Sequence, residues 1–155
     1  MSCEENIQLM RRWFDEVWNQ GRVETIFQMT VPDVLGHGQG TQGEEVRGPE
    51  AYAAFHANIR SAFSELELTV EDMFGCEDRV VTRWSATMKH TGDGLGFPPT
   101  GRDVTLTGIA IARFKDGKIV EGWDAWDQAG MLRQLETGSP SEIALLERRA
   151  SGSAV

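Results

Sequence analysis

The chain has 155 residues, of which 40% are hydrophobic and 25% charged, and its formal net charge is -9. That length suits one domain with a sizeable core. The acidic balance disfavours nucleic acid and anionic membranes as partners, because both attract Lys and Arg. No apolar run approaches the roughly 20 residues of a membrane-spanning helix. The two cysteines, Cys3 and Cys76, fit neither a disulfide framework nor a zinc site, so we expect a cytoplasmic protein.

The N-terminal half predicts helices, because its apolar residues recur at the spacing of one helical face. Residues 4–20 form the first amphipathic pattern, and residues 23–29 a second, shorter one. Residues 34–37 predict a short strand that enters a glycine-rich loop at 38–43. Pro49 then suits the first turn of a further helix, whose apolar stripe continues to Phe63.

From Leu66 the apolar residues alternate with polar ones, as in half-buried strands. An Asp-Gly pair at 116–117 marks a tight hairpin between two of these strands. Helices followed by an antiparallel meander indicate an α+β fold, with the helices on one face of a strongly curved sheet. We expect one domain over 1–137 and a tail over 138–155, with a short helix possible at 141–149. The predicted strands are 66–71, 80–90, 104–114 and 119–126, and the last predicted helix is 128–135.

Three ordered blocks carry a family resemblance. They are residues 78–92, the loop Phe97-Pro98-Pro99-Thr100-Gly101-Arg102, and residues 108–135. Together with weaker matches nearer the N-terminus, they resemble the SnoaL-like polyketide cyclase (ester cyclase) family over roughly residues 5–135. The resemblance implies the nuclear-transport-factor-2-like fold, a cone-shaped, cystatin-like α+β roll or barrel with a one-mouthed pocket. It also implies a homodimer. We expect no cofactor.

The resemblance further implies that an aspartate at the end of the last strand acts as acid and base in an intramolecular aldol cyclisation. The motif places this catalytic aspartate at Asp127. Alternation along the last strand puts Asp127 on the same face as Trp123, so we expect both to line one pocket wall. Asp124 is then expected on the opposite, solvated face, and it is the less favoured alternative for the acid. Asp127 could also be the N-cap of the helix that follows it.

Five further residues are candidates for substrate binding. They are Arg83, Trp123, His37, His56 and Trp84. Arg83 could orient Asp127 or hold a substrate carbonyl, or it could form an ion pair with Glu121 or lie at a dimer interface. His37 could face the pocket mouth or simply be exposed, and His56 could instead be a hydrogen-bonded core histidine. Trp84 would supply aromatic lining. The histidines are scattered along the sequence, so we expect no metal site.

The expected function is acid/base cyclisation or isomerisation of a small, apolar, carbonyl-bearing substrate. The histidine that the resemblance pairs with the aspartate is missing. A limonene-type epoxide hydrolase would need a second aspartate two residues after Arg83, where Ser85 stands. A non-catalytic ligand-binding or dimerising module remains the alternative, because a fold does not by itself give a function. The glycines at 36, 38 and 40 lack the Lys-Ser/Thr pair of a phosphate loop.

Overall fold

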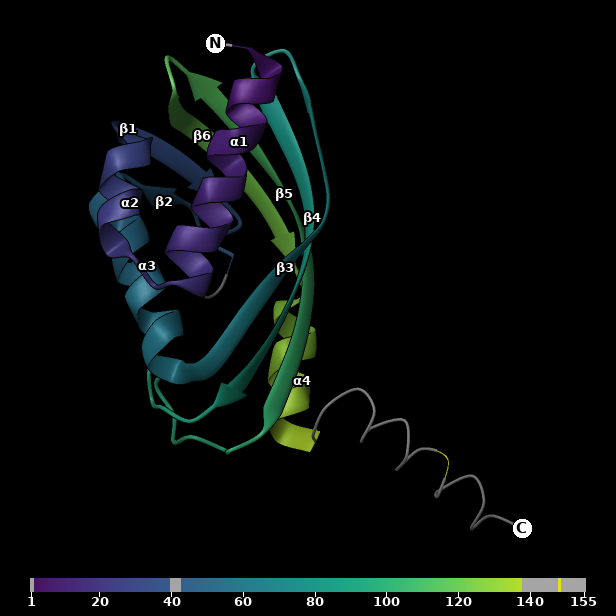
Figure 1. The fold of residues 1–155 in the computed structure, drawn as a ribbon. Coiled ribbons are helices and arrows are strands. Elements are labelled where there is room, and N and C mark those ends of the chain that lie inside the picture. The colour runs from purple at the N-terminus through teal and green to yellow at the C-terminus, as the bar shows by residue number, and fades with distance from the viewer. Residues whose placement is uncertain (1, 40–42, 138–147, 149–155) are drawn as a thin grey trace.

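The computed structural model describes residues 2–39, 43–137 and 148. One curved sheet forms a layer, and the N-terminal helices lie together against one of its faces (Figure 1). The fourth helix lies at the far end of the sheet from the N-terminus. In chain order the elements are α1 (Cys3–Trp13), the π-helix η1 (Phe14–Asn19), α2 (Val23–Met29), β1 (Thr30–His37), β2 (Val46–Arg47), α3 (Pro49–Ala62), β3 (Phe63–Cys76), β4 (Arg79–His90), β5 (Asp103–Lys115), β6 (Lys118–Trp126) and α4 (Gln128–Thr137).

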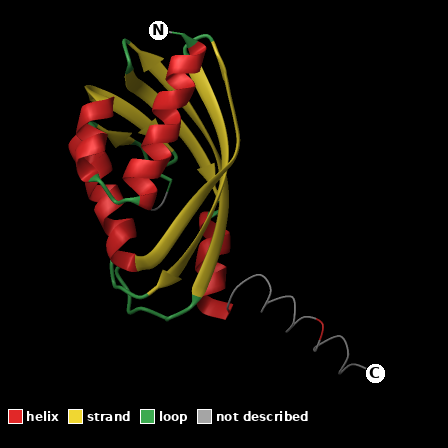
Figure 2. Cartoon of the chain, in the orientation of Figure 1, coloured by secondary structure: helices red, strands yellow, loops and turns green. Residues whose placement is uncertain are grey.

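The six strands form one unclosed sheet in the order β2-β1-β6-β5-β4-β3. The stretch from β3 to β6 is the predicted antiparallel meander, and Figure 2 shows how its long strands bend around the helices. β1 adds to β6 in parallel, which brings the end of β1 beside the middle of β6. The α+β class and the curved sheet under the N-terminal helices are therefore confirmed.

The first helix departs from the expected single element at 4–20. Ser2 and Glu5 form a capping box that starts α1, and Pro49 starts α3 from its first turn. At Phe14, however, α1 widens into a π-helix that ends at Asn19. π-turns are rare and often occur at functional sites. The predicted helix at 141–149 falls almost entirely outside the described residues.

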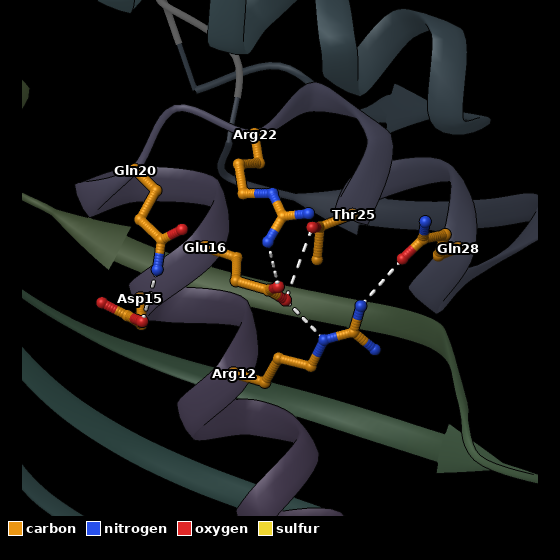
Figure 3. Close-up of polar contacts among 7 residues, drawn as sticks. All are labelled: Arg12, Asp15, Glu16, Gln20, Arg22, Thr25 and Gln28. Carbon is orange, nitrogen blue, oxygen red and sulfur yellow. Dashed lines mark hydrogen bonds and ion pairs between the residues drawn. The ribbon is translucent and has the colours of Figure 1, made fainter.

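A polar network fixes the π-helix to the helices on either side of it (Figure 3). The Glu16 carboxylate accepts hydrogen bonds from Arg12 and, at 2.8 Å, from Arg22. Arg12 also donates to Gln28 at 2.8 Å, which ties the end of α1 to α2. The bend between α1 and α2 is thus held by charge-assisted bonds on its outer side.

In the part of the chain that the structure describes, no helix is both long and apolar enough to cross a membrane.

Candidate active site

Two adjoining cavities lie between the helices and the concave face of the sheet. The walls of the first are mainly aromatic and aliphatic, with Phe14, Trp18, Tyr52, Phe55, Trp84 and Trp126 among the lining residues. The second lies nearer to β1 and shares several of these residues. Asp124 and Gln39 line both cavities, so the two polar side chains stand where the cavities meet. A mostly apolar cavity with few polar groups is typical of a small-molecule site.

A β-bulge decides which residues of β6 face these cavities. Arg113 pairs with Glu121, but the next residue of β5, Phe114, pairs with Ile119, so the register shifts by one residue. Ile119 is buried in the core, and beyond the bulge Gly122 and Asp124 face inward. Simple alternation from Ile119 therefore predicted the wrong face. The sequence led us to expect Asp124 on the solvated face. The structure places it in the cavity wall.

Asp124 is an isolated carboxylate in apolar surroundings. Its Oδ1 atom is buried and has no hydrogen-bond partner among the described residues. Burial raises the pKa of Asp124 from 3.8 to about 7, and the nearby Trp84 indole opposes this rise only in part. Across the ladder on β5 stands Ala110, so no histidine faces the carboxylate from that strand. Such a group can both accept and return a proton near neutral pH.

Trp84 is a cavity residue, as the sequence predicted for the aromatic lining. Its indole lies over Gly108, its partner on β5, where a methyl group would overlap the ring. The buried indole N–H has no hydrogen-bond partner among the described residues. Gly108 therefore allows the indole to reach across β5 toward Asp124.

The aromatic side of the cavity is organised by the π-helix. His56 of α3 donates its Nε2 proton to the Val17 carbonyl at 2.7 Å, and Arg60 donates to the Trp18 carbonyl at 2.9 Å. Asn19 bonds both backbone groups of Leu68 on β3, at 2.9 and 2.7 Å. These bonds satisfy carbonyls at the helix end and hold Trp18 over the cavity. His56 is thus a buried hydrogen-bonded histidine and does not line either cavity.

Tyr52 joins this aromatic side to the carboxylate. Its ring packs against Trp13 and Trp18 at centroid distances of 5.3 and 6.4 Å. Burial, and next the charge of Asp124, raise the pKa of the Tyr52 hydroxyl well above its usual value. Tyr52 therefore stays protonated, as a neutral hydrogen-bond donor near the carboxylate.

Asp127 lies just beyond the last residue of β6, in an exposed position. Its Oδ1 accepts a hydrogen bond from the Gly130 amide at 2.8 Å, and its carbonyl accepts one from Met131 at 3.0 Å. This is the geometry of an N-cap for α4. Asp127 is not among the residues that line the two cavities.

His37, Trp123 and Arg83 lie on the opposite face of the sheet from the cavities. The His37 ring stacks on Trp123 at 5.3 Å and bonds Glu121 at 2.8 Å. Alternation had predicted that Trp123 and an aspartate line the same cavity wall. The structure shows that they do not. Arg83 is exposed beside Trp84, whose side chain points inward. Because Arg83 is solvated, it needs no carboxylate partner to offset burial, and Glu121 bonds Arg113 instead.

The sequence analysis missed Gln39, Tyr52 and Gly108. The signal for Tyr52 was its place on the apolar stripe of α3, where a polar tip can reach a cavity. Gly108, in the middle of a strand, was a signal of close approach by another group. No group of three or more His, Cys, Asp or Glu in the described ranges is arranged to hold a metal ion.

A curved sheet under three helices, with a cavity between the layers, is the nuclear-transport-factor-2-like fold. A sequence model of the SnoaL-like polyketide cyclase family matches residues 8–135. The aklanonic acid methyl ester cyclase DauD of Streptomyces sp. (strain C5) is 34% identical over 132 residues, which cover 83% of this chain and 80% of that protein. The chain belongs to the SnoaL-like polyketide cyclase family.

Two solved structures extend this agreement to the fold. AclR from Streptomyces galilaeus superposes with a TM-score of 0.75 at 29% identity, covering 87% of each chain. IdmH from Streptomyces antibioticus has a TM-score of 0.68 at 32% identity, covering 79% of this chain and 93% of its own. The resemblance predicted from the three sequence blocks is confirmed.

Proposed function

We propose that this protein is an acid/base cyclase that closes a ring in a small, apolar, carbonyl-bearing polyketide ester. One observation carries the proposal: Asp124 places a carboxylate of raised pKa in a cavity lined mainly by aromatic residues. The relatives are named as cyclases of aklanonic acid and nogalonic acid methyl esters, which are substrates of this class.

The chemistry needs one group that can move a proton twice. Asp124 takes a proton from an acidic carbon next to a carbonyl, and the electron pair of that C–H bond forms an enolate. The enolate carbon then bonds to a second carbonyl carbon of the same molecule, whose oxygen becomes an alkoxide. The protonated Asp124 returns the proton to this alkoxide, so no atom is lost. A pKa near the working pH favours both transfers.

Asp127, which the family motif indicates, is the alternative carboxylate. We expect Asp124→Asn to lower kcat on aklanonic acid methyl ester at least about 100-fold, the loss typical of removing an acid/base group. Asp127→Asn is the matched control, because it makes the same change at the N-cap of α4 and Asn also caps helices well. The assay follows the ester and its cyclised product by chromatography. Full activity of Asp124→Asn, with loss in Asp127→Asn, would return the role to Asp127.

We also propose that two copies of the chain pair through the face of the sheet opposite the cavity. Two large apolar side chains are exposed on that face, Phe74 at 56% and Ile109 at 50%. A row of cross-strand neighbours continues from Phe74 through Val81 and Ile111 to Trp123. Exposed apolar patches of this kind often mark protein interfaces.

A further inference from the structure

Gln39 lies over two glycines that have no side chains to obstruct it. Gly36 and Gly122 are partners in the parallel β1–β6 ladder. A methyl group at Gly36 would overlap Gln39 Oε1, and one at Gly122 would come within 3.2 Å of Gln39 Nε2. Together the two glycines leave the space that the Gln39 amide fills. Glycine inside a strand often marks such a close approach.

The backbone that carries Gln39 is fastened to β6. Trp126 donates its indole N–H to the Gly38 carbonyl at 3.1 Å. Gly38 has a φ of +73° and passes so close to the Asp124 carbonyl that a side chain would not fit. Just before it, His37 bonds Glu121 on the other face of the sheet. These contacts fix the direction from which Gln39 enters the cavity.

The amide and the carboxylate are neighbours on the cavity wall. Gly122, on which the amide rests, is two residues before Asp124, so both positions point to the same face of β6. Gln39 and Asp124 also line both cavities. A neutral amide supplies N–H donors without adding a positive charge, which would lower the pKa of Asp124. The pair therefore offers a proton acceptor and a hydrogen-bond donor to one ligand.

We propose that Gln39 is a catalytic hydrogen-bond donor, which binds the substrate oxygen on which negative charge develops while Asp124 moves the proton. The inference rests on the proposed cyclase function. When Asp124 removes the proton, the electron pair moves onto the neighbouring carbonyl oxygen, and a fixed N–H donor stabilises that charge. Donors placed where charge develops lower the barrier without the cost of reorganisation.

Gln39→Met tests this, because it keeps the shape of the side chain and removes the N–H groups. With aklanonic acid methyl ester we expect kcat to fall about 100-fold with KM nearly unchanged, the signature of an interaction made in the transition state. The midpoint of the pH–rate profile should stay that of Asp124. Gln39→Glu should raise this midpoint, since it adds a negative charge near Asp124. Gln8→Met, on the exposed side of α1, is the control and should keep wild-type kinetics.

Gly36→Ala displaces the amide without changing Gln39 itself. Gly36 is not in a left-handed conformation, and the atoms nearest to an added methyl group belong to the flexible end of Gln39. We expect Gly36→Ala to lower kcat like Gln39→Met, and the double variant to be no slower than either single one. Wild-type kcat in Gln39→Met, or losses that multiply in the double variant, would overturn the role of Gln39. Absence of turnover by the wild-type chain would overturn the cyclase function and, with it, this inference.

Discussion

Asp124 and Glu121 are three residues apart on β6, but they lie on opposite faces of the sheet. Asp124 faces the cavity, where burial raises its pKa to about 7. Glu121 faces the other side, where hydrogen bonds from His37 at 2.8 Å and Arg113 at 3.4 Å lower its pKa. The same kind of group is thus isolated on one face and paired on the other.

The difference shows how surroundings select a carboxylate for proton transfer. Glu121 accepts hydrogen bonds from His37 and from the cationic Arg113, which hold it ionised, so its charge is fixed near neutral pH. Asp124 has an indole and a tyrosine hydroxyl nearby, and no cation in the described part of the chain stabilises its charged form, so its charge can change at small energetic cost. Groups with pKa values shifted apart in this way often reveal an acid/base site.

The largest expected effect is the pH dependence of stability. Asp124 has a pKa of about 7 when folded and 3.8 as its ordinary value, so between these values the folded chain holds a proton that the unfolded chain has lost. The contribution of Asp124 to stability therefore falls as pH rises through this window, by up to about 4 kcal/mol, since each unit is worth about 1.4 kcal/mol. Asp124→Asn lacks this loss. In urea unfolding from pH 4 to pH 8, the free energy of unfolding of the variant should rise relative to that of the wild type as the pH increases.

Glu121→Gln should show the opposite sign in the same titration. Because the pKa of Glu121 is lowered by folding, its contribution is present at neutral pH and is lost as pH falls through the folded pKa. The variant should therefore be less stable than the wild type at pH 7, with the difference vanishing in acid. A difference for Asp124→Asn that stays constant between pH 4 and pH 8 would show that Asp124 is not shifted by its cavity.

Elements with a strong local signal were predictable from the sequence. The Asp-Gly turn at 116–117 and the alternation on either side of it fixed the hairpin between β5 and β6. The proline at 49 fixed the start of α3. The π-helix was not predictable, because Phe14 and Val17 are compatible with an ordinary helical stripe. Two of its carbonyls accept hydrogen bonds from His56 and Arg60, which are distant in the sequence, so no local pattern indicates these contacts.

The candidate site was predictable only in part. The family motif indicated the C-terminal end of β6, and Trp84 was expected in the cavity lining. Alternation, however, assigned Asp124 to the wrong face of the sheet. The cause is the bulge near Ile119, which depends on cross-strand pairing with Phe114. Gln39 was hidden for a similar reason, since its place over Gly36 and Gly122 exists only when β1 pairs with β6.

A smaller effect is expected where Trp84 lies on Gly108. Gly108→Ala would push a methyl group into a rigid indole, and we expect a loss of about 2 kcal/mol in the free energy of unfolding, the usual cost of overpacking. Cyclase activity should fall as well, because the indole would move relative to Asp124. Thr107→Ala is the matched control on the opposite face of β5, where the side chain is exposed. If both variants have the stability and activity of the wild type, the close packing of Trp84 on Gly108 is not required.

The smallest effect on the fold is expected on the face opposite the cavity, where a change should alter assembly instead. Ile109 pairs with Arg83 on β4, so Ile109→Lys places two cations side by side on an exposed apolar surface. We expect light scattering at micromolar concentration to give a dimer mass for the wild type and a monomer mass for this variant, with the unfolding midpoint nearly unchanged. Phe27→Lys, at a 45% exposed position on α2, is the control and should stay dimeric. A monomeric wild type, or a dimeric Ile109→Lys, would show that this face is not the interface. The contacts of Glu121 with His37 and Arg113 on this face would then stabilise only the single chain.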